Sequence, residues 1–367
     1  MRKVTLVHGF WHGSWCWSLV TDQLAGRGVQ SVAVDMDGHG LKSRYPRSRW
    51  GRPFDPAAFA VEPSPVAGVT ASSAAETLVG QLKVIGGGEP CVVVAHSMGG
   101  VVATAAAELA PELFAHLVYV AAFAPVRGLP AGAYIASPEN EGSLIPDLLR
   151  ADPAVTGALR IDAGDRGCHD SIRAAFYGDV DEVTAAAAIA LLSTDAPAGA
   201  PAEAFTVTDG RYGAVPHTYV TCTRDNTVPI ALQRRFITEI DAVSQAPTTG
   251  ADDSRRARQL ALAVLVPAGR PRGGGRRRQP LAAAATSQGL LHSHPERIRR
   301  FPCRPVTRTA GRPACGTLAS SGHARRTAAT ATMTASNPMI AAVTGGAVLP
   351  PTARAAPPIA APSAVAM

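Results

Sequence analysis

A serine at a predicted strand-to-helix corner is the residue of this sequence best suited to chemistry. Three consecutive valines at 92–94 predict a buried strand, and small residues then surround Ser97. An alanine-rich helical pattern follows at 101–109. At such a corner the hydroxyl projects from the sheet, and the helix behind it offers unpaired N–H groups to a developing oxyanion. The spacing therefore favours nucleophilic acyl transfer by Ser97.

The residues beside Ser97 nearly complete the pattern G-x-S-x-G, with Ala95 in place of the first glycine. Alanine is small enough to keep the corner. The alternative is a serine in an ordinary strand–helix turn. The hydrophobic run before Ser97 and the paired glycines after it disfavour that alternative.

Charge divides the 367-residue chain into two parts. Residues 1–250 contain 18 Lys and Arg against 25 Asp and Glu, whereas residues 251–367 contain 17 Arg against three acids. The second part has one aromatic residue, Phe301, and too few large apolar groups to offset the entropy of ordering its backbone. We therefore predict a folded domain at 1–250 and a basic, largely disordered tail at 251–367.

Cysteine usage and hydropathy indicate the compartment. The six cysteines are scattered, without a C-x-x-C pair or zinc-like spacing, which favours free thiols in a reducing environment. The first apolar run is broken by His8 and Gly9, too early for a signal peptide, and no run of about 18 apolar residues predicts a membrane span. We expect a soluble cytoplasmic protein.

Short hydrophobic segments alternate with helical patterns along the first part of the chain. This alternation predicts a mostly parallel sheet with helices on both faces, and such sheets hold their chemistry at the carboxyl ends of the strands. A long stretch without strand-like alternation predicts a small helical cap at roughly 123–210, with helices at 146–159, 171–177 and 180–192. Strands are predicted at 3–8, 31–35, 91–95, 117–121 and 218–222, and helices at 15–24, 71–85 (capped by Ser72 or Ser73) and 229–240.

Five segments carry a resemblance to a known family: LVHGFWHGSWCW (6–17), VAVDMDGHG (32–40), VVVAHSMGG (92–100), HLVYVAAFAP (116–125) and TYVTCTRDNTVPIALQ (218–233). The chain resembles the α/β-hydrolases, and within them the small-esterase branch that includes plant methylesterases and hydroxynitrile lyases. It is also similar to actinobacterial α/β-fold hydrolases. The resemblance covers residues 1 to about 246 and implies an α/β-hydrolase fold.

The resemblance also implies roles for four residues. Ser97 is the nucleophile, the backbone N–H groups of Met98 and Phe10 form the oxyanion hole, and Asp225 orients the catalytic histidine. From the residues alone, an aspartate in a turn after a strand is more often a turn former or a helix cap. The carboxylates of residues 35 and 37 compete for this role, but the chain order Ser–Asp–His favours Asp225.

The histidines near these motifs have other expected roles. His96 is adjacent to Ser97, but neighbouring residues at the corner are expected to point apart, which makes it a poor base. His8 and His12 are expected to shape the oxyanion loop and the wall of the pocket.

The histidine that should activate Ser97 is missing. A serine hydroxyl is a weak nucleophile without a base. The family supplies one in a loop resembling L-D-S-S-H-S-P-F, but no histidine lies between Asp225 and Leu291. A reading-frame shift explains the gap, because residues 255–285 are all Ala, Arg, Gln, Leu, Val, Pro or Gly, whose codons can begin with C or G. With permitted codons, residues 254–267 read one nucleotide later give Arg-Val-Val-Leu-Asp-Ser-Ser-His-Ser-Pro-Phe-Leu-Ser.

Residues 251–367 are therefore interpreted as out-of-frame translation. The strand at 218–222 then loses its neighbour and is left as an open edge, which the apolar run 260–266 could fill. A genuine basic extension that contacts nucleic acid through its arginines is the alternative, and no aromatic interleaving supports it. His292, His294 and His323 lie in this tail, and whether one of them replaces the missing base stays open.

Together these features predict a serine hydrolase that acts on a small carboxylic ester through an acyl-enzyme and is impaired by the missing histidine. The alternatives are cyanohydrin cleavage on the same scaffold and a catalytically inactive frame-shifted product. We expect no cofactor, no metal and no membrane partner, and nucleic acid binding is disfavoured. The sequence leaves the substrate and the oligomeric state open.

Overall fold

Six parallel strands form the sheet that carries the candidate site. The computed structural model describes residues 2–252, and the order of the strands is β2–β1–β3–β4–β7–β8. All neighbours in this order pair in parallel, as the alternation of strands and helices predicts. The strands are β1 (Val4–Val7), β2 (Ser31–Val34), β3 (Cys91–His96), β4 (Phe114–Val120), β7 (His217–Thr221) and β8 (Thr249–Asp252).

The prediction that β7 forms an open edge is wrong. Strand β8 pairs with it in the register Thr218↔Thr249 to Thr221↔Asp252. The chain between α11 (Ile230–Asp241) and β8 is held in place, because Gln245 N–H donates to the Gly213 carbonyl at 2.9 Å and Thr248 N–H donates to Asp241 Oδ1 at 2.6 Å. A short ordered connection therefore supplies the missing neighbour. Residues 251 and 252, the first two of the predicted tail, belong to β8, whereas the run 260–266 and the other tail residues lie outside the described residues.

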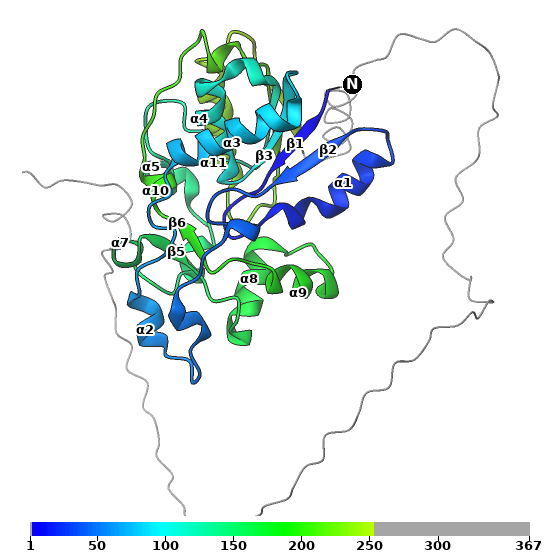
Figure 1. Ribbon diagram of the computed structural model, residues 1–367. Coiled ribbons are helices and arrows are strands. Elements are labelled where there is room, and N and C mark those ends of the chain that lie inside the picture. Colours follow the sequence, from blue (N-terminus) through cyan, green and yellow to red (C-terminus); the bar gives the residue numbers. More distant parts are fainter. Residues whose placement is uncertain (1, 253–367) are drawn as a thin grey trace, which may run out of the picture. The chain divides into compact units, whose positions relative to one another are not determined.

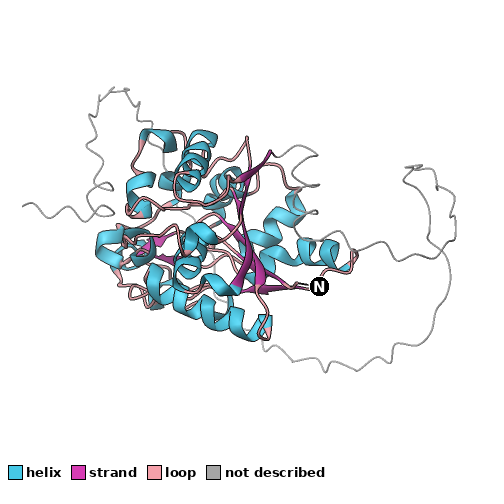
Figure 2. Cartoon of the chain, turned by 90° about the horizontal axis from the view of Figure 1, so that it is seen from above, coloured by secondary structure: helices cyan, strands magenta, loops and turns pink. Residues whose placement is uncertain are grey.

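Helices cover both faces of the sheet, as Figure 2 shows from above. On one face, Trp17 and Leu24 from the region of α1 (Ser18–Ala25) pack against side chains of β1 and β3. On the other face, α3 (Ala71–Gly86), α4 (Gly99–Leu109) and α11 contribute to the larger hydrophobic cluster around Val93 and Leu117. The alternation of β3 side chains between these two clusters fixes the strand within the core.

The N-cap of α3 and the presence of α2 differ from the sequence predictions. Thr70, rather than Ser72 or Ser73, caps α3: its hydroxyl accepts from the Ser73 N–H, and the Ser73 hydroxyl accepts from the Thr70 N–H. This reciprocal pair satisfies two N–H groups that the first turn leaves free. The stretch 41–68, without a predicted element, contains α2 (Pro56–Val61), whose first turn is capped by Asp55.

The segment between β4 and β7, where a cap is predicted, contains short helices and a small second sheet. The helix predicted at 146–159 is wrong: Pro153 interrupts it, and Gly157 ends the following turn with a φ of 72°. Figure 1 shows β5, β6, α8 and α9 gathered beyond the ends of β1 and β2. The elements are α5 (Ala131–Ile135), α6 (Ile145–Leu148), α7 (Pro153–Thr156), β5 (Ala158–Arg160), α8 (His169–Phe176), α9 (Glu182–Ala190), β6 (Asp195–Pro197) and α10 (Gly199–Ala202).

One buried ion pair ties this segment together. The Arg160 guanidinium on β5 binds the Asp195 carboxylate on β6 through two bonds of 2.7 and 2.8 Å, and both side chains are fully buried. Arg160 also donates to the carbonyls of Phe59 and Glu62 beside α2. The Arg160 side chain therefore links the antiparallel pair β5–β6 to the α2 region by hydrogen bonds.

Candidate active site

Ser97 lies at the corner between β3 and α4 in a strained backbone conformation. Its φ is 52°, in the left-handed region that non-glycine residues rarely occupy. The surrounding backbone fixes this conformation, because the Ser97 carbonyl accepts from the N–H groups of Gly100 and Phe123, both at 3.0 Å. The predicted strand–corner–helix is confirmed, and the strain is the kind that a nucleophile corner stores.

The glycines around Ser97 allow the close approach of two backbone segments. A Cβ atom on Gly99 would lie 2.2 Å from the carbonyl oxygen of His8, and one on Gly9 would lie 2.7 Å from the Cβ of Ser97. Side chains at these positions would push the loop after β1 away from the corner. The loop after β1 and the nucleophile corner therefore meet because both sequences supply a glycine there.

Two backbone N–H groups near Ser97 have no hydrogen-bond partner among the residues that the structure describes. Within residues 2–252, no hydrogen bond engages the N–H of Met98 or that of Phe10. Met98 is the N-cap residue of α4, so the N-terminal end of the helix dipole adds to this positive region. Phe10 and Met98 both line the same cavity as Ser97.

The loop that carries Phe10 is held by the segment between β4 and β7. Trp11 has a φ of 61°, its indole N–H donates to the Leu159 carbonyl at 3.0 Å, and its own carbonyl accepts from Ser193 N–H at 2.7 Å. Leu159 lies within β5, and Ser193 lies two residues before β6. The geometry of the candidate oxyanion loop therefore depends on that segment as well as on β1.

His12 links Phe10 to the same segment. Its Nδ1 contacts the Phe10 carbonyl oxygen at 2.8 Å, and its Nε2 contacts the Tyr177 hydroxyl at 2.9 Å. A carbonyl only accepts, so Nδ1 carries the proton; burial lowers the pKa of His12 to about 4, which leaves Nε2 as acceptor for the tyrosine hydroxyl. His12 is thus a neutral spacer that shapes the loop, as predicted.

His8 and His39 contact the loop that carries Phe10, and both are neutral. His8 Nδ1 donates to the Gly9 carbonyl at 2.7 Å, and Nε2 accepts from Met36 N–H at 3.1 Å. Burial is the main cause that lowers the pKa of His8, and burial also lowers the pKa of His39 to about 4. The ring of His39 stacks on Phe10 with centroids 5.5 Å apart. Both histidines therefore support the loop by packing.

Asp225 follows β7 and forms a turn. Its Oδ1 accepts three hydrogen bonds at 2.7 to 2.9 Å, from Thr227 N–H, the Thr227 hydroxyl and Val228 N–H. The turn-forming role that the residues alone suggest is therefore real. Its negative charge also acts on the imidazole of His96, where it opposes the effect of burial on the pKa. Asp225 is thus both a turn former and a charge near the nucleophile corner.

Asp35 and Asp37, the alternatives to Asp225 as the catalytic acid, form hydrogen bonds around the loop after β2. Asp35 accepts from the N–H groups of Ser14 and Leu41 at 2.6 and 2.9 Å. Asp37 accepts from the Thr77 hydroxyl at 2.6 Å. Neither lines the cavity that contains Ser97. Both are therefore occupied with local structure away from that serine.

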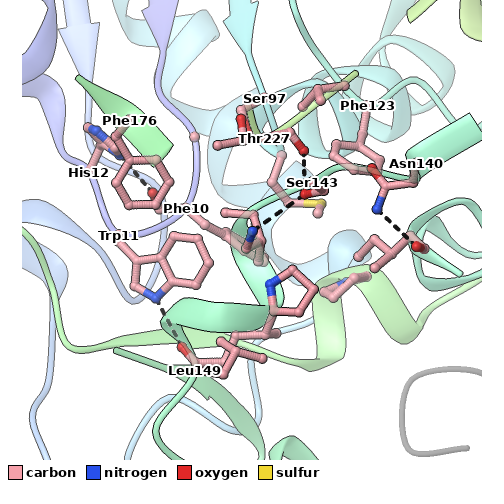
Figure 3. A pocket seen from close by; sticks show the side chains of 18 of the residues that line it. Phe10, Trp11, His12, Ser97, Phe123, Asn140, Ser143, Leu149, Phe176 and Thr227 are labelled. Atoms are coloured by element: carbon pink, nitrogen blue, oxygen red, sulfur yellow. Dashed lines mark hydrogen bonds between the residues drawn. The ribbon is translucent and has the colours of Figure 1, made fainter. Parts of the chain in front are cut away.

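The cavity around Ser97 is almost entirely apolar, and Figure 3 shows its lining. Within residues 2–252, no Lys, Arg, Asp or Glu side chain lines it. Polar side-chain atoms come from Ser97, His12, His96, Asn140, Ser143 and Thr227. Asn140 and Ser143 already donate to the carbonyls of Ile135 and Thr227. The remaining wall is built by Phe10, Trp11, Met98, Phe123, Ile135, Ile145, Pro146, Leu149, Pro153, Leu159, Phe176, Pro201 and Val228.

Most of this wall could not be identified from the sequence. Ile145, Leu149 and Phe176 come from short helices and turns between β4 and β7, and they carry no motif. An apolar residue in such a segment signals burial and does not signal which cavity it lines. His292, His294 and His323 lie outside the described residues.

Within residues 2–252, no group of three or more His, Cys, Asp or Glu side chains is arranged to hold a metal ion. No helix there is long and apolar enough to cross a membrane.

The sequence matches the Alpha/beta hydrolase family over residues 6–252. This match covers more than half of the 367 residues, so the chain belongs to that family. The predicted fold class and the predicted hydrolase class are therefore confirmed.

Individual relatives agree with this assignment. Methylesterase 7 of Arabidopsis thaliana is 27% identical over 254 residues, which are 65% of this chain and 84% of that protein. Methyl jasmonate esterase 1 of Vitis vinifera is 32% identical over 124 residues, 34% of this chain and 40% of that protein. The predicted similarity to plant methylesterases is confirmed. A solved structure of the pyrethroid hydrolase PytH has a TM-score of 0.53 at 19% identity and covers 73% of this chain and 99% of its own, a likeness of fold alone.

Proposed function

We propose that this chain hydrolyses small, uncharged carboxylic esters through an acyl-enzyme on Ser97. One observation carries the proposal: a strained serine opens into an apolar cavity beside two backbone N–H groups that nothing else engages. The names of the relatives, a methylesterase and a methyl jasmonate esterase, support an ester as the substrate.

The proposed chemistry follows from the residues around Ser97. Its hydroxyl oxygen attacks the carbonyl carbon, and the electron pair of the carbonyl moves to the oxygen, which the N–H groups of Met98 and Phe10 stabilise. The alcohol leaves, and water then hydrolyses the acyl-enzyme. The preformed N–H pair is the main contribution of the fold, since removing one such donor typically costs about 10²–10³-fold in turnover. Asp225 is proposed to act by its charge on the base.

The cavity lining favours an uncharged substrate. A carboxylate or ammonium group buried there would lose its hydration without meeting an opposite charge, because no ionic side chain of residues 2–252 lines the cavity. An alkyl or aryl group would instead bury apolar surface at about 25 cal/mol per Å². We therefore infer that the cavity discriminates against esters with a second, ionised carboxylate.

A matched pair of chromogenic substrates tests the proposal. We expect hydrolysis of 4-nitrophenyl hexanoate, at least about 10-fold weaker hydrolysis of the anionic mono-4-nitrophenyl adipate, which has the same chain length, and loss of both activities in Ser97→Ala. Ser18→Ala, a change of an exposed serine on α1, is the control and should retain the rate. Hydrolysis that persists in Ser97→Ala would refute the proposal, and so would the absence of any hydrolysis.

Cyanohydrin cleavage is the alternative chemistry expected from the sequence. No contact or lining residue in residues 2–252 favours it over ester hydrolysis. We therefore do not propose it.

A further inference from the structure

The amide oxygen of Asn140 is a buried acceptor without a donor in the wall of the cavity. Asn140 lines the cavity together with Ser97, and Figure 3 shows its side chain there. The residue is 8% exposed, and its Oδ1 is buried with no hydrogen-bond partner among residues 2–252. In that part of the chain, no other buried and unpartnered side-chain atom belongs to a residue of the cavity wall. An acceptor buried without a donor is unfavourable, so a donor placed beside it is bound favourably.

The orientation of the Asn140 amide is fixed by its surroundings. Its Nδ2 donates to the Ile135 carbonyl at 2.9 Å. Because a carbonyl oxygen only accepts, turning the amide over would place two acceptors against each other. The backbone is held as well: the Asn140 N–H donates to the Ser137 carbonyl at 3.0 Å, and the Asn140 carbonyl accepts from the Ser143 N–H at 3.2 Å. The unpaired atom is therefore an oxygen at a fixed place.

The neighbouring hydroxyl groups of the wall already use their protons within the protein. The Ser143 hydroxyl donates to the Thr227 carbonyl at 2.9 Å, and the Thr227 hydroxyl donates to Asp225 Oδ1 at 2.8 Å. Each of these hydroxyl oxygens can therefore still accept a hydrogen bond but has no proton left to donate. The capacity that Asn140, Ser143 and Thr227 have left consists of three acceptor oxygens and the second N–H of Asn140. This balance favours a ligand that brings a donor.

We propose that Asn140 Oδ1 determines specificity by accepting a hydrogen bond from a neutral donor of the substrate, a hydroxyl group or an amide N–H. The proposal rests on the proposed function of Ser97, and it narrows the substrates to uncharged esters that carry such a donor away from the ester group. A donor supplies the partner that Oδ1 lacks, whereas an alkyl group at the same place leaves the oxygen unpaired. An ammonium group is disfavoured, because one amide oxygen does not replace its hydration and no carboxylate of residues 2–252 lines the cavity.

Matched pairs of esters test this role on the full chain. Methyl hydroxybenzoates carry the donor in the acyl part, and 2-(hydroxyphenyl)ethyl acetates carry it in the alcohol part, with the hydroxyl group at ring position 3 or 4. The partner of each ester has a methyl group in place of the hydroxyl group, which keeps the size and removes the donor. For at least one pair, we expect kcat/KM of the unmodified chain to be about 10-fold higher for the hydroxyl ester. Transfer into an apolar cavity alone would favour the methyl ester instead.

Two variants separate the hydrogen bond from other effects. Asn140→Leu has a side chain of similar size without the acceptor, and it should reverse the preference in favour of the methyl ester. Ser143→Ala is the matched control, because it removes a cavity hydroxyl group that already has a protein partner, and it should keep the preference. Asn140→Leu also leaves the Ile135 carbonyl without its donor, so thermal unfolding checks that the variant is folded. The comparison within each pair on the unmodified chain stands without either variant.

Two results would overturn the role of Asn140 and leave the proposed function standing. In the first, 4-nitrophenyl hexanoate is hydrolysed in a Ser97-dependent way, but no hydroxyl ester exceeds its methyl partner by more than about threefold. In the second, a preference for the hydroxyl ester persists in folded Asn140→Leu. If no ester, 4-nitrophenyl hexanoate included, is hydrolysed in a Ser97-dependent way, the proposed function is wrong and the role of Asn140 with it.

Discussion

Removing the buried guanidinium of Arg160 should destabilise the chain strongly. Arg160→Met keeps an unbranched side chain of similar length and removes both bonds to Asp195, at 2.7 and 2.8 Å. The Asp195 carboxylate, 1% exposed as a residue, would then be buried without its partner. Breaking a buried pair in this way typically costs about 3–5 kcal/mol. We expect the free energy of unfolding to fall by about that amount.

Urea denaturation followed by tryptophan fluorescence measures this loss, and two further variants interpret it. The double variant Arg160→Met, Asp195→Leu removes both charges and should recover at least about 2 kcal/mol, because no uncompensated charge remains. Recovery is incomplete since the carbonyls of Phe59 and Glu62 still lack their donor. Arg235→Met, which breaks partly exposed pairs with Glu139 and Glu239, should cost only about 1 kcal/mol. A loss below about 1 kcal/mol for Arg160→Met would refute the reasoning.

Three further outcomes are expected. Gly99→Val should abolish Ser97-dependent hydrolysis, because its Cβ would lie 2.2 Å from the His8 carbonyl oxygen; a rate within threefold of the wild type would contradict the close approach. Tyr177→Phe leaves His12 Nε2 without its donor, at a cost of about 1–3 kcal/mol, and should lower kcat with Phe10 less firmly held; an unchanged kcat would rule out this role. The free energy of unfolding should decrease as pH falls from about 6.5 to 4. Burial in the folded chain lowers the pKa of His12 to about 4 and that of His217 to about 3. The unfolded chain therefore binds more protons than the folded chain in this pH range. His217→Phe should flatten the slope of melting temperature against pH between 7 and 5, and an unchanged slope would count against this assignment.

The sequence predicts the strand, corner and helix around Ser97 well because the signal is local. Small residues around Ser97, a β-branched strand before it and an alanine-rich helix after it define one backbone path, and the structure has that path with a φ of 52° at Ser97. The close approach of the loop after β1 to this corner is equally local, since Gly9 and Gly99 must both be small for the two segments to meet.

The cavity is not a local property, because its lining comes from segments far apart in the sequence, such as Phe10, Ile145 and Val228. Pro153 and Gly157 interrupt the helix predicted at 146–159. Apolar spacing alone does not show where the backbone hydrogen bonds of a helix must end.

The most direct test of the central claim is mass spectrometry of the full chain mixed rapidly with 4-nitrophenyl hexanoate and quenched in acid. Acylation of Ser97 predicts a hexanoyl adduct on the peptide that contains residues 92–100, and no adduct in Ser97→Ala. Hydrolysis without an adduct on that peptide, or an adduct on another residue that persists in Ser97→Ala, would contradict the assignment of Ser97 as the nucleophile.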